Sequence, residues 1–383
     1  MAFLTSHTSH TSHTSHTSHT SHADFVSYSG RVASPMLAEG LISSQKGLGH
    51  WALDGQGRPI SATAVLAPGL RAGWGGAGLL DASAEQRFFG MEALPRSYVC
   101  HSELMGLIEF SGGSAGGVVE LIHRGTGNAI VRLQRPDYGV FVEQLETVHQ
   151  LSAQRQTRYA EILPQVNPAD AWWSAVLGLR PERHRMTYEF LNAALNFTVT
   201  IVFRLKQMFA CPRPMEYSSD IQPLILTPGH DSWPSGHATE SFLQARILAT
   251  LSGGSLPAHV VERHLLTTAA RIAENREVAG LHFPADSAVG RVLGDTLARF
   301  VLSYSAGPGP QPTSIMARTR KFLAPEFYGP PLADANRTPP LPLGDTTFET
   351  DFGVGEGWLA APAALPPQPY MHWLWRRALG EWV

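Results

Sequence analysis

Apolar residues recur every three or four positions through most of the chain between Tyr138 and Tyr304, which is the spacing of helices with one buried face. Prolines and glycines interrupt this pattern, and each interruption coincides with an expected helix end. The pattern predicts helices over residues 138–164, 169–177, 181–206, 235–252, 257–276 and 284–301. Three of these start at a proline, a residue that fits the first turn of a helix.

A different pattern precedes the helices. Two short runs rich in aliphatic and β-branched residues, 118–122 and 129–133, flank the segment Gly125–Asn128. Such runs joined by a Gly/Asn turn predict a β-hairpin. Residues 24–117 are rich in Gly, Ala and Ser without a clear period, so we expect loops and short helices there, wrapped around the rest of the fold.

The run 189–203 is apolar on more than one face, which raises the question of a membrane span. A span requires about 20 apolar residues, and this run is shorter. Glu189 and Arg204 also bracket it closely. We therefore interpret it as a buried core helix and expect no transmembrane span.

The chain ends in a region of another kind. The run Gly307–Pro312 marks a boundary, and residues 313–383 hold many of the 28 prolines without any period before Tyr370. This composition predicts an extended strap on the core surface. The last stretch, 371–382, is rich in aromatic residues, and we expect it to form a helix packed on the core or on a second subunit, so that a homo-oligomer stays open.

Composition narrows the function only broadly. With 383 residues, 43% of them hydrophobic, the chain can form a sizeable core. The formal net charge of −3 is close to balanced, which argues against nucleic acid or an anionic membrane as the main partner. The two cysteines, Cys100 and Cys211, do not make a disulfide framework.

Residues 5–22 are six Thr-Ser-His triplets and hold six of the 17 histidines. Because the tract has no apolar side chain to bury, we expect residues 1–23 to form a disordered polar tail. The preceding Met1–Leu4 is too short for the apolar core of a signal peptide. We therefore expect a cytoplasmic protein.

Three polar clusters stand between the expected helices. In chain order they are Lys206 with Arg213, then Ser235-Gly236-His237, then Arg276 with His282 and Asp286. Guanidinium forks and an ammonium group neutralise and grip a tetrahedral oxyanion such as phosphate or vanadate. A hydroxyl and a backbone N–H at the start of a helix, here from Ser235 and Gly236, add further donors.

The two histidines of these clusters provide chemistry. One can attack the central atom of the oxyanion while the other protonates the leaving oxygen. Asp286 follows His282 by four residues and can accept the proton of the far ring nitrogen, which would orient this histidine as a nucleophile.

Arranged as Lys-x6-Arg-Pro, Pro-Ser-Gly-His and Arg-x5-His-x3-Asp, the clusters resemble the signature of the type 2 phosphatidic acid phosphatase (PAP2) / vanadium-dependent haloperoxidase superfamily. Asn275 stands where the superfamily pattern has Ser before its arginine. The resemblance covers residues 184–304. It implies a mainly α fold, a helical bundle of the acid phosphatase/vanadium-dependent haloperoxidase type, with the small β-hairpin in the N-terminal region.

On this basis the chain divides into four parts. They are a disordered repeat tail (1–23), a Gly/Ala-rich accessory region with the hairpin (24–137), a helical catalytic domain (138–306) and a Pro-rich strap with a terminal aromatic helix (307–383).

The resemblance implies two activities, of which we favour hydrolysis of a small-molecule phosphoric ester without a cofactor. His282 would attack phosphorus and form a phosphohistidine, Asp286 would orient its ring, and His237 would protonate the leaving alcohol. The residues matching the oxyanion ligands of the superfamily are Lys206, Arg213, Ser235, Gly236 and Arg276.

The alternative is a haloperoxidase that holds vanadate at His282 as its cofactor and oxidises halide with hydrogen peroxide. Phe203 and His230 are expected at the rim of the site, and an added histidine there resembles bromide-oxidising members. The amino-acid sequence of residues 280–286 is closer to that of the phosphatases in the superfamily. Apart from vanadate in the haloperoxidase, neither activity requires a metal site among the clusters. A third hypothesis is a non-catalytic oxyanion-binding protein.

Overall fold

The computed structural model describes residues 56, 84–113, 117–167, 169–253, 258–306, 318–323, 357–358 and 369–382. The expectations for the Thr-Ser-His tail, for most of residues 24–83 and for most of the Pro-rich strap lie outside these residues. The chain divides into two compact units, residues 23–96 and the remainder. In the first, α4 (Ala84–Phe89) is followed by the start of α5 (Ala93–Met105), where the Arg96 guanidinium donates to the carbonyl of Phe89 at 3.2 Å.

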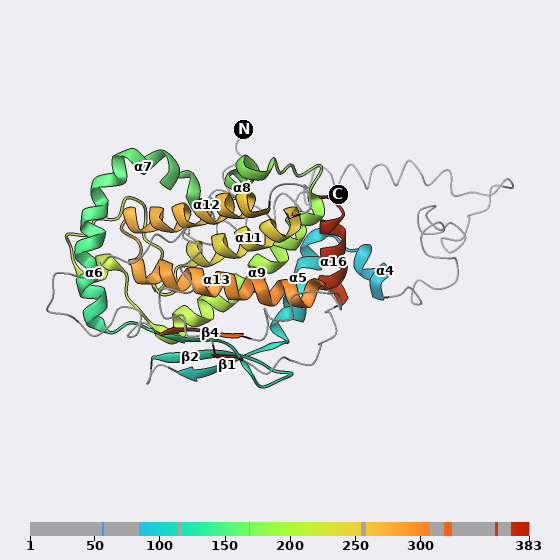
Figure 1. The fold of residues 1–383 in the computed structure, drawn as a ribbon, viewed down its shortest axis with the longest axis horizontal. Coiled ribbons are helices and arrows are strands. Elements are labelled where there is room, and N and C mark those ends of the chain that lie inside the picture. The colour runs from blue at the N-terminus through green and yellow to red at the C-terminus, as the bar shows by residue number, and fades with distance from the viewer. Residues whose placement is uncertain are drawn as a thin grey trace. The chain divides into compact units, whose positions relative to one another are not determined.

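Helices dominate the larger unit, which confirms the mainly α class (Figure 1). Several of their ends lie at prolines and glycines of the sequence. They are α6 (Tyr138–Leu151), η4 (Ser152–Gln154), α7 (Arg155–Ile162), η5 (Pro164–Val166), α8 (Asp170–Leu177), α9 (Arg185–Phe209), α10 (Pro214–Tyr217), α11 (Gly236–Ser252), α12 (Ala258–Val278), α13 (Pro284–Ala306) and α16 (Pro369–Leu379).

Several helix boundaries differ from the sequence prediction. The expected helix over 138–164 is divided into α6, η4, α7 and η5. The helix expected from Pro181 begins only at Arg185, because the ring of His184 accepts the N–H of Arg180 at 3.1 Å and residues 181–184 form a turn. The same helix, α9, runs past Lys206 to Phe209 and ends where Ala210 adopts a left-handed conformation.

α11 packs between α12 and α13 (Figure 1). Two glycines allow α13 to approach closely. A Cβ atom at Gly290 would lie 2.9 Å from the carbonyl oxygen of Ser235, and one at Gly294 would lie 2.4 Å from that of Thr239. Any side chain at these positions would push the two helices apart, so the start of α11 is held directly against α13.

α9 is the buried core helix that the apolar run 189–203 predicts. Phe190, Phe197 and Ile201 on it have no exposed surface. In the part of the chain that the structure describes, no helix combines the length and the apolar character needed to cross a bilayer.

The predicted hairpin is present as β2 (Val118–His123) and β3 (Ala129–Gln134), which pair antiparallel. β1 (Ile108–Gly113) pairs antiparallel with β2, and β4 (Arg318–Leu323) pairs parallel with β3. β5 (Gly357–Trp358) completes the sheet beside β4. The sheet is larger than the hairpin alone because β4 and β5 come from the distant C-terminal region, and α13 contacts both β3 and β4.

The terminal aromatic helix, α16, packs on α9 and α13 of the same chain. Its Trp375 ring lies 5.3 Å from that of Phe190. Just beyond the helix, the Glu381 carboxylate accepts the N–H groups of Met186 at 2.7 Å and Thr187 at 2.8 Å. This carboxylate satisfies two N–H donors that the first turn of α9 leaves without partners. Its negative charge also interacts favourably with the positive end of the helix dipole.

Candidate active site

The three polar clusters meet where α9 ends, α11 begins and α12 passes into α13. Nη1 of Arg213 donates to the carbonyl of Leu281 at 2.9 Å, which joins the first cluster to the third. The N–H of Ser235 donates to the carbonyl of Asp286 at 3.0 Å, which joins the second to the third. We call the candidate anion-binding and histidine residues the oxyanion site, which consists of Lys206, Arg213, Ser235, Gly236, His237, Arg276 and His282.

Arg213 lies on an extended loop between two prolines, as the sequence predicts, with φ −84° and ψ 160°. Its guanidinium group is buried. Nε donates to the carbonyl of His230 at 2.8 Å, and Nη1 lies 3.4 Å from Nε2 of His282. Burial lowers the pKa of Arg213 to about 10, so the group stays charged at neutral pH. A positive charge is therefore fixed beside the His282 ring.

Lys206 extends from the last turns of α9 to the loop that precedes Ser235. Its Nζ atom donates to the carbonyls of Asp231 at 2.6 Å and Ser232 at 2.8 Å. Burial and then the neighbouring Arg213 charge lower the pKa of Lys206. The two hydrogen bonds tether this loop to α9 and bring the ammonium group to the side of the site occupied by Arg213.

His282 lies on the loop between α12 and α13 and contacts Asp286. Its Nδ1 atom lies 2.9 Å from Oδ2 of Asp286, an oxygen that also accepts the N–H of Phe283 at 2.9 Å and the hydroxyl of Ser232. An ionised carboxylate only accepts, so the His282 proton resides on Nδ1 and the lone pair on Nε2. This is the tautomer that a nucleophilic histidine requires.

Ser235 caps α11. Its hydroxyl accepts the N–H of Ala238 at 3.4 Å, so the helix begins at Gly236 and directs the positive end of its dipole at the site. The nearest neighbour of a Cβ atom at Gly236 would be Oε1 of Glu240, at 3.5 Å. Internal packing therefore does not require a glycine here, whereas close approach of an anion to the backbone favours one.

His237, in the first turn of α11, is held by the backbone of η5. Its Nε2 atom lies 3.0 Å from the carbonyl oxygen of Gln165. Because a carbonyl only accepts, Nε2 carries a proton and Nδ1 is the nitrogen that gains or loses one. The ring is thus oriented for proton transfer at Nδ1.

Arg276 is fully buried near the end of α12. Its Nη2 atom donates to the carbonyl of Ile162 at 2.8 Å and to Oε1 of Gln165 at 3.1 Å. Its Nε and Nη1 atoms are buried without a hydrogen-bond partner among the described residues. Unsatisfied buried donors are costly, and a bound oxyanion would satisfy them.

Burial and neighbouring cations keep both imidazoles neutral. Burial, and then the charge of Arg276, lower the pKa of His237 to about 3. Burial, followed by Arg213 and Lys206, lowers the pKa of His282 well below its usual value. Asp286 shifts the other way, since burial raises its pKa to about 6, and it remains ionised at pH 7. A bound anion would oppose the cations and raise the pKa of either histidine.

The two expected rim residues contact each other. The Phe203 and His230 rings meet edge to face with centroids 5.0 Å apart, and both side chains are half-buried. Nδ1 of His230 lies 3.2 Å from Nη2 of Arg213. His230 is thus next to the oxyanion site, while its role there stays a prediction.

Sequence reasoning missed two residues that hold the site together. Ser232 donates to Asp286, and its position three residues before Ser235 offered a weak signal at most. Gln165 contacts both His237 and Arg276. No local pattern marks Gln165, which lies 72 residues before His237.

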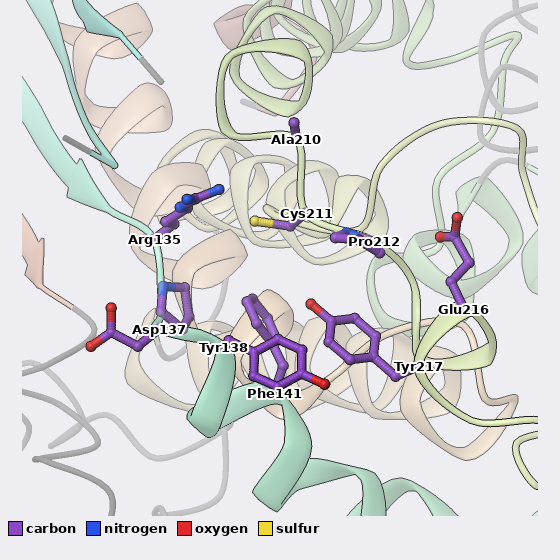
Figure 2. Close-up of a pocket in the computed structure, with 10 residues that line it drawn as sticks. Arg135, Asp137, Tyr138, Phe141, Ala210, Cys211, Pro212, Glu216 and Tyr217 are labelled. Carbon is purple, nitrogen blue, oxygen red and sulfur yellow. The ribbon is translucent and has the colours of Figure 1, made fainter. Parts of the chain in front are cut away.

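A pocket of about 450 Å³ adjoins the loop that carries Arg213 (Figure 2). Phe141 and Tyr217 in its wall both contact the ring of Phe283, with centroids 5.0 and 5.5 Å from it. None of the oxyanion-site residues lines this pocket. Its lining residues are Arg135, Pro136, Asp137, Tyr138, Phe141, Ala210, Cys211, Pro212, Glu216 and Tyr217.

Comparison with known proteins identifies relatives of this chain. A family model described as the PAP2 superfamily matches residues 187–307. Decaprenylphosphoryl-5-phosphoribose phosphatases from two Mycobacterium tuberculosis strains, CDC 1551 and H37Rv, are each 35% identical over 81 residues, or 21% of this chain. The match spans only 41% of the length of these relatives.

Among solved structures, the first transmembrane PAP2 type phosphatidylglycerolphosphate phosphatase from Bacillus subtilis aligns with 18% identity and a TM-score of 0.27. The alignment covers 43% of this chain and 76% of that one. All three polar clusters fall within the residues that the family model matches. The chain therefore carries a PAP2 superfamily domain at residues 187–307.

Proposed function

We propose that this protein is a phosphatase that hydrolyses a phosphoric ester through a phosphohistidine at His282. One observation carries the proposal. Asp286 holds the His282 proton on Nδ1, so Nε2 carries the lone pair and accepts a long contact of 3.4 Å from Nη1 of Arg213. A neutral imidazole nitrogen beside a fixed guanidinium group is suited to attack the phosphorus of a bound phosphate ester. The phosphatase names of the M. tuberculosis relatives agree with this activity.

In the first step, Nε2 of His282 would form a bond to phosphorus while the bond from phosphorus to the ester oxygen breaks. The positive charge that develops on the ring is stabilised by the Asp286 carboxylate at Nδ1. Arg276 has two buried nitrogens available for the phosphoryl oxygens. Donors already aimed at the developing charge lower the barrier without reorganising.

His237 is the proposed general acid and base. Its Nδ1 would give a proton to the leaving alcohol and then take one from the water that hydrolyses the phosphohistidine. In the free protein its pKa of about 3 keeps the ring neutral. The negative charge of bound substrate would raise this pKa and allow the ring to be protonated when needed.

The test is an assay of pure full-length protein with a chromogenic phosphate ester, followed by rapid quenching to trap the phosphoenzyme. A phosphoryl group on the protein that is acid-labile, stable in alkali and absent from His282→Ala is expected. Ester hydrolysis that leaves no phosphoryl group on wild-type protein under single-turnover conditions would contradict the phosphohistidine route.

The second candidate is a vanadium-dependent haloperoxidase, and the contact of His230 with Arg213 favours it. The buried donors of Arg276 and the unprotonated Nε2 of His282 suit vanadate as well as phosphate. When bound, vanadate would supply the activation of peroxide for halide oxidation. In that reaction Lys206, Arg213 and Arg276 would hold the anion, and His237 would move the proton. Halide-dependent peroxide consumption after addition of vanadate, without ester hydrolysis, would select this candidate.

A further inference from the structure

A segment outside the matched PAP2 domain contacts the C-terminal half of α12. This segment, residues 155–166, comprises α7 and η5. Nε of Arg155 donates to the carbonyl of Val278 at 2.9 Å, near the end of α12. The Arg271 guanidinium of α12 pairs with both oxygens of Glu161, at 2.7 and 2.9 Å. These contacts fix the segment against the helix that carries Arg276.

Gln165 is the point at which this segment reaches the oxyanion site. Its side-chain Oε1 accepts from Nη2 of Arg276 at 3.1 Å and from Nδ2 of Asn275 at 2.9 Å. Its backbone carbonyl accepts from Nε2 of His237 at 3.0 Å. Only 3% of its surface is exposed. One buried residue thus holds an anion-binding arginine and the proposed general acid at once.

The residue at which this chain departs from the superfamily pattern, Asn275, belongs to the same hydrogen-bond network. Asn275, which stands in place of Ser, also donates to Oε2 of Glu161 at 2.9 Å. Its side-chain oxygen lies 3.3 Å from Nη1 of Arg158. A serine side chain has two fewer heavy atoms than an asparagine and has no amide to make both donations. The Asn side chain therefore links α12 to the 155–166 segment through contacts that the superfamily residue does not provide.

We propose that Gln165 is a positioning residue of the oxyanion site, which fixes the Arg276 guanidinium and the His237 ring and is itself held by Asn275. This inference rests on the proposed function, because it assigns Gln165 a role at the same anion site.

The hydrogen bonds to Arg276 decide which of its donors remain for the anion. Oε1 of Gln165 and the carbonyl of Ile162 both engage Nη2. Nε and Nη1 stay buried and without partners among the described residues. Nε2 of Gln165 itself is a further buried donor without a partner there. With Nη2 held, the guanidinium plane is fixed and its other donors are set in place for an anion before binding, which avoids an ordering cost.

The hydrogen bond from His237 to Gln165 affects the pKa of the imidazole. The titratable groups that face His237 are Arg276 of α12, Arg213, His230 and His282. Burial, and then Arg276, Arg213 and His230, disfavour the protonated ring. The hydrogen bond to the Gln165 carbonyl acts in the opposite direction and raises the pKa. Loss of the side-chain anchor at Gln165 would loosen this carbonyl, and His237 would then lose its proton at lower pH.

The experiment compares full-length wild type, Gln165→Ala and Asn275→Ser, with Gln156→Ala as a matched control, since Gln156 is exposed on α7. Phosphate and vanadate affinities are measured by calorimetry, and kcat is measured against pH with a chromogenic phosphate ester. Gln165→Ala is expected to bind both anions about tenfold more weakly, the effect of one hydrogen bond to a charged group. The alkaline limb of its kcat profile is expected to move to lower pH. Asn275→Ser is expected to show a smaller shift in the same direction.

Unchanged anion affinity in Gln165→Ala would overturn the positioning role even if wild type proves to be an active phosphatase. Conversely, a loss of anion affinity in a protein without esterase activity would support the role and contradict the proposed reaction. Wild type that binds neither anion would overturn both. If Gln165→Ala does not fold, Gln165→Glu keeps the volume and an acceptor for Arg276. Its carboxylate would compete with the anion for that arginine, so affinity should fall at least as far, and unchanged affinity would again overturn the role.

Discussion

Nδ1 of His282 lies 2.9 Å from Oδ2 of Asp286, across the boundary between a loop and the first turn of α13. The helix start fixes this pair, because the N–H of Phe283 also donates to the same oxygen at 2.9 Å. A carboxylate near a helix N-terminus is stabilised by the dipole, which helps Asp286 remain ionised although it is fully buried. The loop histidine is thus oriented by α13 rather than by its own backbone.

The first prediction concerns this pair. His282→Ala should abolish ester hydrolysis, because it removes the proposed nucleophile, and Asp286→Asn should reduce kcat by about 100-fold or more through loss of the charge that stabilises the imidazolium. Melting temperature and circular dichroism would check the fold of both variants. His282→Ala with even a tenth of wild-type activity would exclude the nucleophilic role.

The second prediction concerns Arg276. Arg276→Ala should weaken vanadate binding by about 1.5–3 kcal/mol, because it removes at least one charge-assisted hydrogen bond. Arg263→Ala is the matched control, since Arg263 is exposed on the same helix. Calorimetric titration of vanadate would compare the variants at equal ionic strength. Equal affinities in Arg276→Ala and wild type would show that Arg276 does not bind the anion.

The third prediction concerns the contact between α11 and α13. A Cβ atom at Gly294 would lie 2.4 Å from the Thr239 carbonyl oxygen, so Gly294→Ala forces the two helices apart. We expect a loss of about 1–3 kcal/mol in the free energy of unfolding, the usual cost of overpacking. Gly253→Ala serves as the control, since its nearest contact would be 3.4 Å away. Equal denaturation midpoints for the two variants would contradict this packing.

From the sequence alone, those helix ends and loops that depend on residues a few positions away could be predicted. Pro284 starts α13, Gly178 ends α8 in a left-handed conformation, and Pro212 and Pro214 place Arg213 on a loop. The histidine and aspartate of the third cluster could be paired because four residues separate them. In each case the cause lies within a few positions of the effect.

The contacts that sequence reasoning missed join residues far apart in the chain. Gln165 meets Arg276 across 111 positions, and Ser232 meets Asp286 across 54. No period or motif signals such a pairing, because tertiary packing alone brings the two residues together. The strand β4 was missed for the same reason, since it pairs with β3 from far along the chain.

The fourth prediction concerns Glu277, a buried carboxyl next to Arg276 in the chain. Burial raises its pKa from 4.5 to about 8, so the group stays protonated in the folded protein at pH 7. The unfolded chain releases this proton above pH 4.5, and unfolding therefore becomes more favourable as pH rises from 4.5 to about 8. Glu277→Gln cannot ionise and should remove this loss. The gain in unfolding free energy over wild type should grow across that window, by at most about 1.4 kcal/mol per pH unit. A gain independent of pH would contradict the buried neutral state.

The fifth prediction has the opposite sign and concerns His237. Its pKa of about 3 in the folded protein lies below the 6.5 of an unfolded histidine. Below pH 6.5 the unfolded chain therefore binds a proton that the folded protein does not, and stability falls as the pH falls. His237→Gln removes this titration, so its unfolding free energy relative to wild type should rise between pH 6.5 and pH 5 and stay constant above pH 7.5. Urea denaturation at each pH would measure the difference, in which the other titrating groups cancel.

Saturating vanadate should reduce the slope of this difference against pH, because a bound anion raises the pKa of His237 toward its usual value. The same slope with and without vanadate would place His237 outside the reach of the bound anion, and its role as general acid would be excluded.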